Sequence, residues 1–208
     1  SMLDKLLQKH VSSTGSVDYK NFKKDEKTLD QYLTLLSNNP PAKSWSKNER
    51  LAYWINVYNE FTIKKILKNY PLKSITDLND GKPWDEIWIK IGKKMYSLNN
   101  IEHDILRKEF KEPRIHFALN CSAKSCPIML NKAYNPTELD NQLEKQTNNF
   151  INDSQVNQID ANNMKLSKIF EWYSADFGDV RKFVNKYAKK PSNAKIAFKD
   201  YDWHLNEK

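Results

Sequence analysis

Groups that can act as nucleophiles, bases or anion ligands are concentrated between Ile101 and Pro127. Both cysteines, two of the four histidines and two of the four arginines of the 208-residue chain fall in this stretch. Cys121 follows an apolar run, and a thiol at the exit of a buried element stands where folds usually present reactive groups. The N–H groups of the Ser122–Ser125 turn and the charge of Lys124 would stabilise its thiolate. Nucleophilic cysteine chemistry is therefore the first hypothesis.

A thiol nucleophile needs a base within hydrogen-bond reach, and His103 and His116 are the two candidates. The segment Arg114–Asn120 has the pattern of a buried strand, on which the face of His116 need not meet Cys121. His103 belongs to a predicted helix that can lie beside the cysteine. We therefore expect His103 to be the base for Cys121, and Cys126, which precedes Pro127, to be the slower thiol.

Two arginines stand out in a chain that uses Lys almost everywhere else. Arg107 lies one helical turn after His103, and Arg114 precedes His116 by two residues. The planar guanidinium suits a substrate carboxylate. The alternative is a structural ion pair of Arg107 with a neighbouring carboxylate, that of Asp104 or Glu109. Together with these two arginines, the residues expected to bind a substrate are Asn59, His116, Glu171 and Tyr173.

Other interpretations of the same residues stay open. Buried cysteines and histidines are more often structural than catalytic. Cys121 and Cys126 are also close enough to form a local disulfide, although four residues separate them where the common redox motif has two. A zinc site of His103, His116 and both cysteines has acceptable ligand types, but its spacing matches no compact zinc finger. We expect no metal and no cofactor.

Helices make up most of the elements that must position these groups. The strongest prediction runs from Ser46 to Asn69, because Ser46-Lys-Asn-Glu49 is a capping-box pattern. Asn59 falls in the middle of the apolar arc of this helix, with Asn56 at its edge. Both side chains should therefore be buried and hydrogen-bonded to another segment. Further helices are predicted over residues 3–10, 27–36, 136–151, 167–173 and 179–187, and from residues 97–100 onward.

Short strands are predicted between the helices. They are a hairpin of residues 87–91 and 95–97 with a turn at Gly92, the buried strand Arg114–Asn120, and a last strand over residues 195–198. Helices interrupted by a few short strands predict an α+β fold. We expect a mostly helical single globular domain over residues 3–208, with a small antiparallel sheet.

Composition excludes some classes of function. The net charge of +8 comes from lysines scattered along the chain rather than gathered in a basic stripe, which disfavours specific nucleic-acid binding. No apolar run approaches the roughly 20 residues of a membrane-spanning helix. Ser1-Met2 resembles the remnant of an expression tag, so the natural N-terminus and the cellular location, export included, are left open.

Five motifs in a fixed order resemble domain-of-unknown-function family 547. They are Ala52–Asn59, Leu98–His103, Pro113–Cys121 with Ser125–Pro127, Leu166–Tyr173 and Tyr201–Trp203. The resemblance implies one family domain over about residues 43–206, of a kind often exported in bacteria and fused to coiled-coil segments in plants. It implies no particular activity. The family-motif positions include Asn56, Asn59, His103, His116, Cys121 and Asp202.

Two functions follow from the residues. The first is a cysteine-dependent hydrolase or acyl-transferase acting on a peptide or amide, with Cys121 as nucleophile, His103 as base and the turn N–H groups as an oxyanion hole. The alternative is a non-catalytic domain that binds a small ligand or a peptide in an aromatic pocket. A Cys121 sulfur within about 4 Å of an imidazole nitrogen, in an open cleft, would favour the enzyme.

Overall fold

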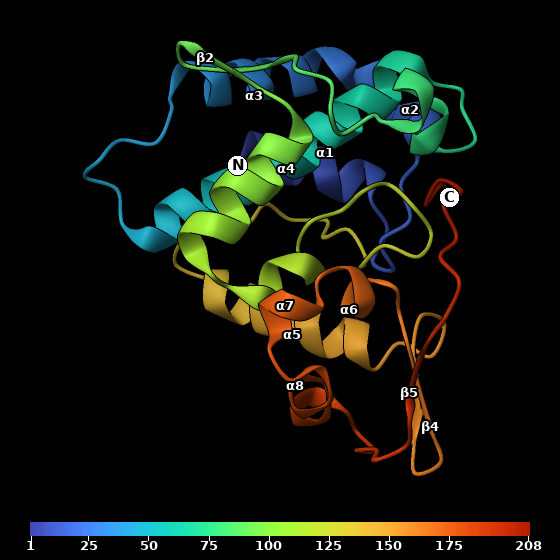
Figure 1. Cartoon of the computed structure of the whole chain (residues 1–208). Helices are drawn as coiled ribbons and strands as arrows, with labels where there is room; N and C mark the ends of the chain where they lie inside the picture. Colours follow the sequence, from blue (N-terminus) through green and yellow to red (C-terminus); the bar gives the residue numbers. More distant parts are fainter.

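The computed structural model describes all residues from Ser1 to Lys208. Figure 1 shows the N-terminal helices and the first hairpin in the upper part of the molecule, and the C-terminal helices and strands in the lower part. The segment before α5 passes between the two parts. The α-helices are α1 (Met2–His10), α2 (Tyr19–Phe22), α3 (Glu26–Asn38), α4 (Lys47–Asn69), α5 (Leu139–Ile151), α6 (Ile169–Trp172), α7 (Ser174–Phe177) and α8 (Val180–Tyr187).

The remaining helices are one π-helix and several 3₁₀-helices. The π-helix η4 (Asn100–Phe110) packs against α4, and the 3₁₀-helix η5 (Pro113–Phe117) packs against α5. Short 3₁₀ turns are η1 (Lys23–Asp25), η2 (Ile75–Asp77) and η3 (Asn79–Gly81). None of the helices is both long and apolar enough to cross a membrane.

The strands form two small sheets. Strands β1 (Ile89–Ile91) and β2 (Lys94–Tyr96) are the predicted hairpin. In the second sheet, β3 (Gln158–Asp160) and β4 (Asn163–Leu166) are antiparallel, whereas β5 (Ile196–Phe198) runs parallel to β4. The predicted α+β class is confirmed, although the strands form two sheets rather than one and one pair is parallel.

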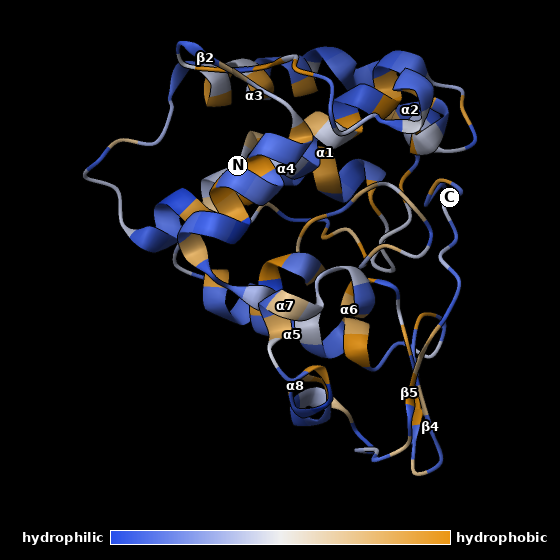
Figure 2. Cartoon of the chain, in the orientation of Figure 1, coloured by the Kyte–Doolittle hydropathy of each residue, from blue (hydrophilic) through white to orange (hydrophobic).

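Helix α4 is the central element of the upper part. Its predicted capping box is present: the Glu49 N–H donates to Ser46 Oγ at 3.2 Å, and the Ser46 N–H donates to the Glu49 carboxylate at 2.7 Å. Most residues from Leu51 to Leu67 are buried, because α3 and η4 pack against the helix. Figure 2 shows hydrophobic and hydrophilic bands alternating along α3, α4 and α5, the pattern of helices that bury one face.

The predicted strand Arg114–Asn120 is wrong, because this segment begins with η5. Pro113 occupies the first turn, where its missing N–H costs nothing, and the Glu112 side chain accepts from the Arg114 N–H at 3.1 Å. Successive residues of a 3₁₀-helix point about 120° apart. The protein has two separate hydrophobic cores, one in the upper part and one in the lower part. Ile115 accordingly packs in the upper core and Phe117 in the lower one. The η5 helix therefore joins the two cores.

Helix α5 begins three residues later than predicted. The Asn135 side chain accepts from the Thr137 N–H at 3.0 Å and from the Thr137 hydroxyl at 2.8 Å. This local turn competes with helix formation and delays the helix to Leu139.

The Asn59 side chain links α4 to the segment that follows η5, which confirms the expectation that it is buried and bonded. It is 5 % exposed. Its Nδ2 donates to the Ala118 carbonyl at 3.0 Å, and its Oδ1 accepts from the Asn120 N–H at 2.8 Å. Asn56 makes the same pair of bonds to the backbone of Tyr134. Each side-chain amide therefore supplies a donor and an acceptor to a backbone segment that has no regular backbone partner there.

Replacing Asn59 with Leu should destabilise the fold by about 1–3 kcal/mol, because a buried carbonyl and a buried N–H lose their partners. Chemical denaturation measures this loss. The matched control is Asn48→Leu in the exposed first turn of the same helix, which should have a much smaller effect. An Asn59→Leu protein as stable as the wild type would contradict this account of the amide.

Glu60 is a buried carboxyl group without a cation beside it. It is 1 % exposed, and its Oε2 has no hydrogen-bond partner. Burial raises the pKa of Glu60 from its ordinary value of 4.5 to about 8. Between these two pH values the unfolded chain loses the proton while the folded chain keeps it, so the group lowers stability progressively as the pH rises from 4.5 to 8.

Glu60→Gln should therefore gain stability relative to the wild type as the pH is raised, by about 2–3 kcal/mol between pH 4.5 and pH 7. Denaturation series at several pH values measure the difference in the free energy of unfolding. The slope of this difference against pH is insensitive to any pH-independent effect of the amide on packing. The exposed Glu109→Gln on η4 is the control. A pH-independent difference for Glu60→Gln would show that this carboxyl does not titrate in the way described.

Candidate functional site

A cleft of about 240 Å³ lies where α4, η4, α6, the segment after η5 and the C-terminal segment meet. Its walls are mainly aromatic, and Trp172, one of its walls, is 47 % exposed. The aromatic residues of the cleft are Tyr58, Trp84, Trp172, Tyr173, Tyr201 and Trp203, and its polar residues are Asn99, Glu102 and His116. The cleft is therefore an apolar hollow with a few polar groups, which is the usual form of a ligand site.

The two cysteines lie in this cleft and are joined to each other. Cys121 and Cys126 form a disulfide, and no free cysteine remains. The hydroxyl of Tyr201 lies 3.3 Å from each sulfur. Of the states that the sequence leaves open for these residues, the structure contains the local bridge. The Cys121 sulfur can act as a nucleophile only after this bond has been reduced.

The disulfide loop is held by hydrogen bonds that use its own N–H groups. The Asn120 amide bridges the loop, since its Nδ2 donates to the Pro127 carbonyl and its Oδ1 accepts from the Ser122 N–H, both at 2.8 Å. The N–H groups of Lys124 and Ser125 donate to carbonyls of the C-terminal segment, at 2.8 and 3.2 Å. These three N–H groups, expected to serve an oxyanion hole, are therefore occupied by the protein itself.

His116 is held in the cleft by Asp176. Its Nε2 lies 2.7 Å from Asp176 Oδ2, and its ring stacks on Tyr173 with centroids 4.0 Å apart. A carboxylate only accepts, so Nε2 carries the hydrogen and Nδ1 of the neutral ring is the acceptor. Burial lowers the pKa of His116 below its ordinary value of 6.5, outweighing the opposite effect of Asp176. His116 is therefore neutral at pH 7. The unfolded chain protonates this ring at a higher pH than the folded protein does, so the folded protein loses stability as the pH falls below about 6.5.

Arg107 binds the same carboxylate with its planar fork. Its Nε and one terminal nitrogen donate to the two oxygens of Asp176 at 2.6 and 2.9 Å. The hydrogen bonds of Arg107 and His116 hold the pKa of Asp176 below its ordinary value, so this carboxylate stays charged. The ion pair joins η4 to α7 and does not involve the expected partners Asp104 and Glu109. The fork of Arg107 is thus not free for a substrate carboxylate.

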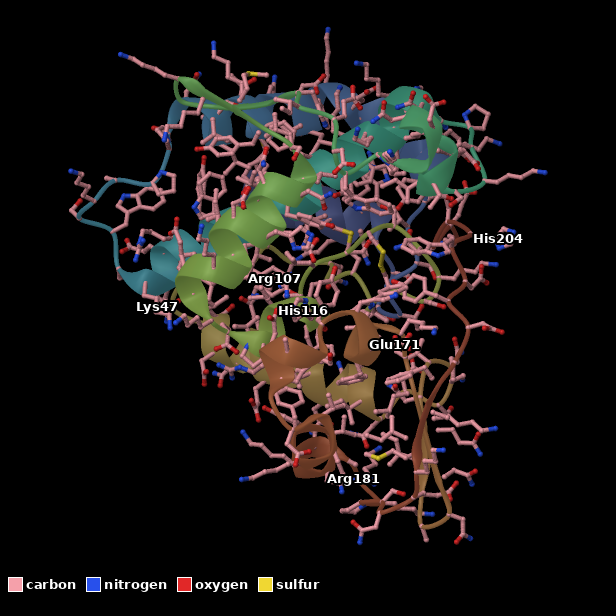
Figure 3. The ribbon with its side chains drawn as sticks, in the orientation of Figure 1. Lys47, Arg107, His116, Glu171, Arg181 and His204 are labelled. Carbon is pink, nitrogen blue, oxygen red and sulfur yellow. A yellow bond between two sulfur atoms is a disulfide. The ribbon has the colours of Figure 1, made fainter.

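His103 is bonded to Arg107. Its Nδ1 accepts from the third nitrogen of Arg107 at 3.0 Å, because a guanidinium can only donate. His103 is not among the residues that line the cleft, whereas His116 lines it together with Cys121. Figure 3 shows Arg107 and His116 close together near the middle of the molecule. The histidine that shares the cleft with the cysteine is therefore not the one selected from the sequence.

The remaining sequence candidates lie in different places. Tyr173 lines the cleft, but Asn59 is engaged with the backbone as described above. Arg114 binds Glu112, and it also binds Asp140 and Glu144 of α5, at 2.9, 2.8 and 3.1 Å, so it ties η5 to α5. Glu171 is exposed and pairs with Lys168 at 2.5 Å; in Figure 3 it lies apart from Arg107 and His116. Of the substrate-binding candidates, His116 and Tyr173 meet in the cleft.

Sequence reasoning missed Glu102 and most of the aromatic wall. Glu102 is 6 % exposed and lines the cleft beside Tyr58 and Tyr173. It directly precedes His103 in the Leu98–His103 motif. Trp172, Tyr201 and Trp203 all occur in the sequence motifs, and that recurrence of aromatic residues was the available signal.

The candidate zinc ligands do not form a metal site. The two sulfurs are bonded to each other, and the two histidines bond to Arg107 and Asp176. The structure contains no group of three or more His, Cys, Asp or Glu side chains placed to hold a metal ion.

Comparison with known proteins gives one match. The model of a family described as "Protein of unknown function, DUF547" matches residues 42–151. No curated protein and no solved structure matches the chain. The matched region holds α4, η4, η5 and the disulfide loop, and it ends before α6 and the C-terminal segment, which complete the cleft. Since this region is more than half of the 208 residues, the chain belongs to the DUF547 family.

Proposed function

We propose that this protein binds a small ligand or a peptide in the aromatic cleft. The observation that carries the proposal is the cleft itself, an apolar hollow into which the side chains of Glu102 and His116 bring polar groups. A few polar groups in a largely aromatic hollow give a ligand both affinity and orientation. In the neutral His116 ring Nδ1 is the acceptor, because Nε2 donates to Asp176.

The aromatic wall is formed before any ligand arrives. Tyr201 packs against Trp203 and Trp172 with ring centroids 4.6 and 4.9 Å apart, and Trp172 stacks on Trp203 at 5.9 Å. Trp84 meets the edge of Trp203 at 5.5 Å. Rings fixed by one another lose little conformational entropy when a ligand binds. The exposure of Trp172 in this position supports a surface that is kept open for a partner.

The oxidised cleft is better suited to binding than to acyl transfer. Its sulfurs are bonded to each other, and three N–H groups of the turn are bonded within the protein. The guanidinium of Arg107 is bonded to Asp176 and His103. A nucleophile, an oxyanion hole and a carboxylate clamp would each require one of these bonds to be broken first.

NMR of the indole N–H groups tests the binding proposal. Trp84, Trp172 and Trp203 line the cleft, while Trp45, Trp54 and Trp88 do not and serve as internal controls. A library of small neutral, cationic and anionic fragments at millimolar concentration should contain compounds that shift the three cleft indoles and leave the other three in place. Trp172→Ala should weaken those compounds, and Trp45→Ala should not.

Two outcomes of this screen would contradict the proposal. One is a library in which no fragment moves the cleft indoles more than the control indoles. The other is binding that Trp172→Ala leaves unchanged, since Trp172 is the exposed wall of the cleft.

A cysteine-dependent hydrolase or acyl-transferase acting on a peptide or amide is the second candidate function. One observation favours it: Cys121 and His116 line the same cleft, and Asp176 orients His116. In the reduced protein the Cys121 thiolate would attack the carbonyl carbon, and the imidazolium of the base would return its proton to the leaving amine as the C–N bond breaks. Water would then hydrolyse the thioester and restore the thiol.

Alkylation of the protein reduced with a phosphine tests this candidate. It requires a thiol that reacts quickly near pH 7, and this fast phase should disappear in Cys121→Ser and persist in Cys126→Ser. If His116 is the base, His116→Ala moves the reaction to higher pH; if His103 is the base, His103→Ala does so. Two thiols no faster than an ordinary free cysteine would remove this candidate.

A further inference from the structure

Glu102 brings an unpaired negative charge to the cleft. Its side chain is nearly buried, at 6 % exposure, and it forms no ion pair with any Lys, Arg or His, although Arg107 lies one turn further along η4. Arg107 is held by Asp176 instead. Burial and the neighbouring Glu102 carboxylate hold the pKa of both Tyr58 and Tyr173 above the ordinary value, so both phenols stay neutral. They cannot compensate the charge of Glu102.

No cation lines the cleft to balance this charge. Among the lining residues Glu102 is the one with a formal charge, because His116 is neutral at pH 7. Asp176 is already balanced by Arg107. The cleft is thus a negative site in a protein whose net charge is +8. A nearly buried carboxylate whose partners are the neutral Tyr58 and Tyr173 side chains rather than a cation costs stability, and a cationic ligand would offset that cost.

The rings around this carboxylate suit a cation as well. Indole and phenol faces attract a cation through their quadrupoles, and Trp is the strongest of these partners. Trp84, Trp172 and Trp203 lie in the wall, and Tyr201 contacts the latter two. The cleft volume of about 240 Å³ is below the roughly 300–1,000 Å³ of sites for drug-sized ligands, which indicates a small ligand or one end of a larger one.

We propose that the cleft binds a small organic cation, a quaternary ammonium or protonated alkylamine group, with Glu102 as its counter-ion and the indoles as its walls. This inference rests on the binding function proposed above. An anion is disfavoured by the same groups, because it would meet the Glu102 carboxylate and the negative faces of the rings. No side chain has to move out of the cleft for the cation to bind.

The experiment compares choline with 3,3-dimethyl-1-butanol, its neutral isostere, on the oxidised full chain. Indole N–H shifts of Trp84, Trp172 and Trp203 report binding of both probes. Choline should bind about tenfold more tightly, because only the charged probe gains from the carboxylate and the ring faces. Glu102→Gln should reduce the affinity for choline by about tenfold and leave the neutral probe unchanged.

Glu109→Gln is the matched control, because Glu109 is an exposed glutamate on the same helix; it should bind choline as the wild type does. Thermal melting verifies that both variants fold. If Glu102→Gln does not fold, the comparison of the two probes on the wild-type chain decides the question by itself.

The inference is overturned if choline binds no more tightly than its isostere, or if Glu102→Gln binds choline like the wild type. These failures differ from failure of the proposed function. When neutral or anionic fragments shift the cleft indoles and choline does not, the cleft is a ligand site with a different preference. When no fragment of any charge shifts them, both proposals fall.

Discussion

The side-chain amide of Asn59 fixes the position of the segment from which the cleft is built. Asn59 stands in the middle of α4, and its two hydrogen bonds hold the backbone of Ala118 and Asn120, immediately before the disulfide. Asn120 continues the arrangement by bridging both ends of the disulfide loop. This segment has no regular strand to satisfy its polar backbone, so side-chain amides must do so. Without them the loop that carries Cys121 would have no defined place on α4.

A second constraint comes from the geometry of the 3₁₀-helix η5, which has three residues per turn. Ile115 is buried in the upper core and Phe117 in the lower one, and His116 between them faces the cleft. The two apolar anchors fix the rotation of the helix, and Asp176 then fixes the imidazole within it. Asp176 is itself oriented by two bonds from Arg107. The position of His116 therefore depends on packing in both halves of the molecule.

Local signals in the sequence predicted the elements that local interactions determine. The capping box located the start of α4, and the apolar arc of that helix identified Asn59 as a buried amide. The apolar run at Arg114–Asn120 favours a strand that the structure does not contain, because a short buried helix and a buried strand share the same composition. The N-terminal cap formed by Glu112 and Pro113 was the signal that could have separated them.

The cleft could not be predicted in the same way, because it is assembled from distant segments. Asp176 binds His116 across a separation of 60 residues, and the Tyr201 hydroxyl contacts the disulfide across a separation of 80. His103 and Glu102 are neighbours on η4, and Glu102 is the one that lines the cleft. Pairings over such separations leave no periodic trace in a single sequence.

The most direct measurement of the central claim is a crystal structure of the oxidised protein grown with tetramethylammonium. We expect the cation in the cleft, in contact with the indole faces of Trp172 and Trp203 and close to the Glu102 carboxylate. A cation bound at another surface, with the cleft holding only solvent, would contradict it.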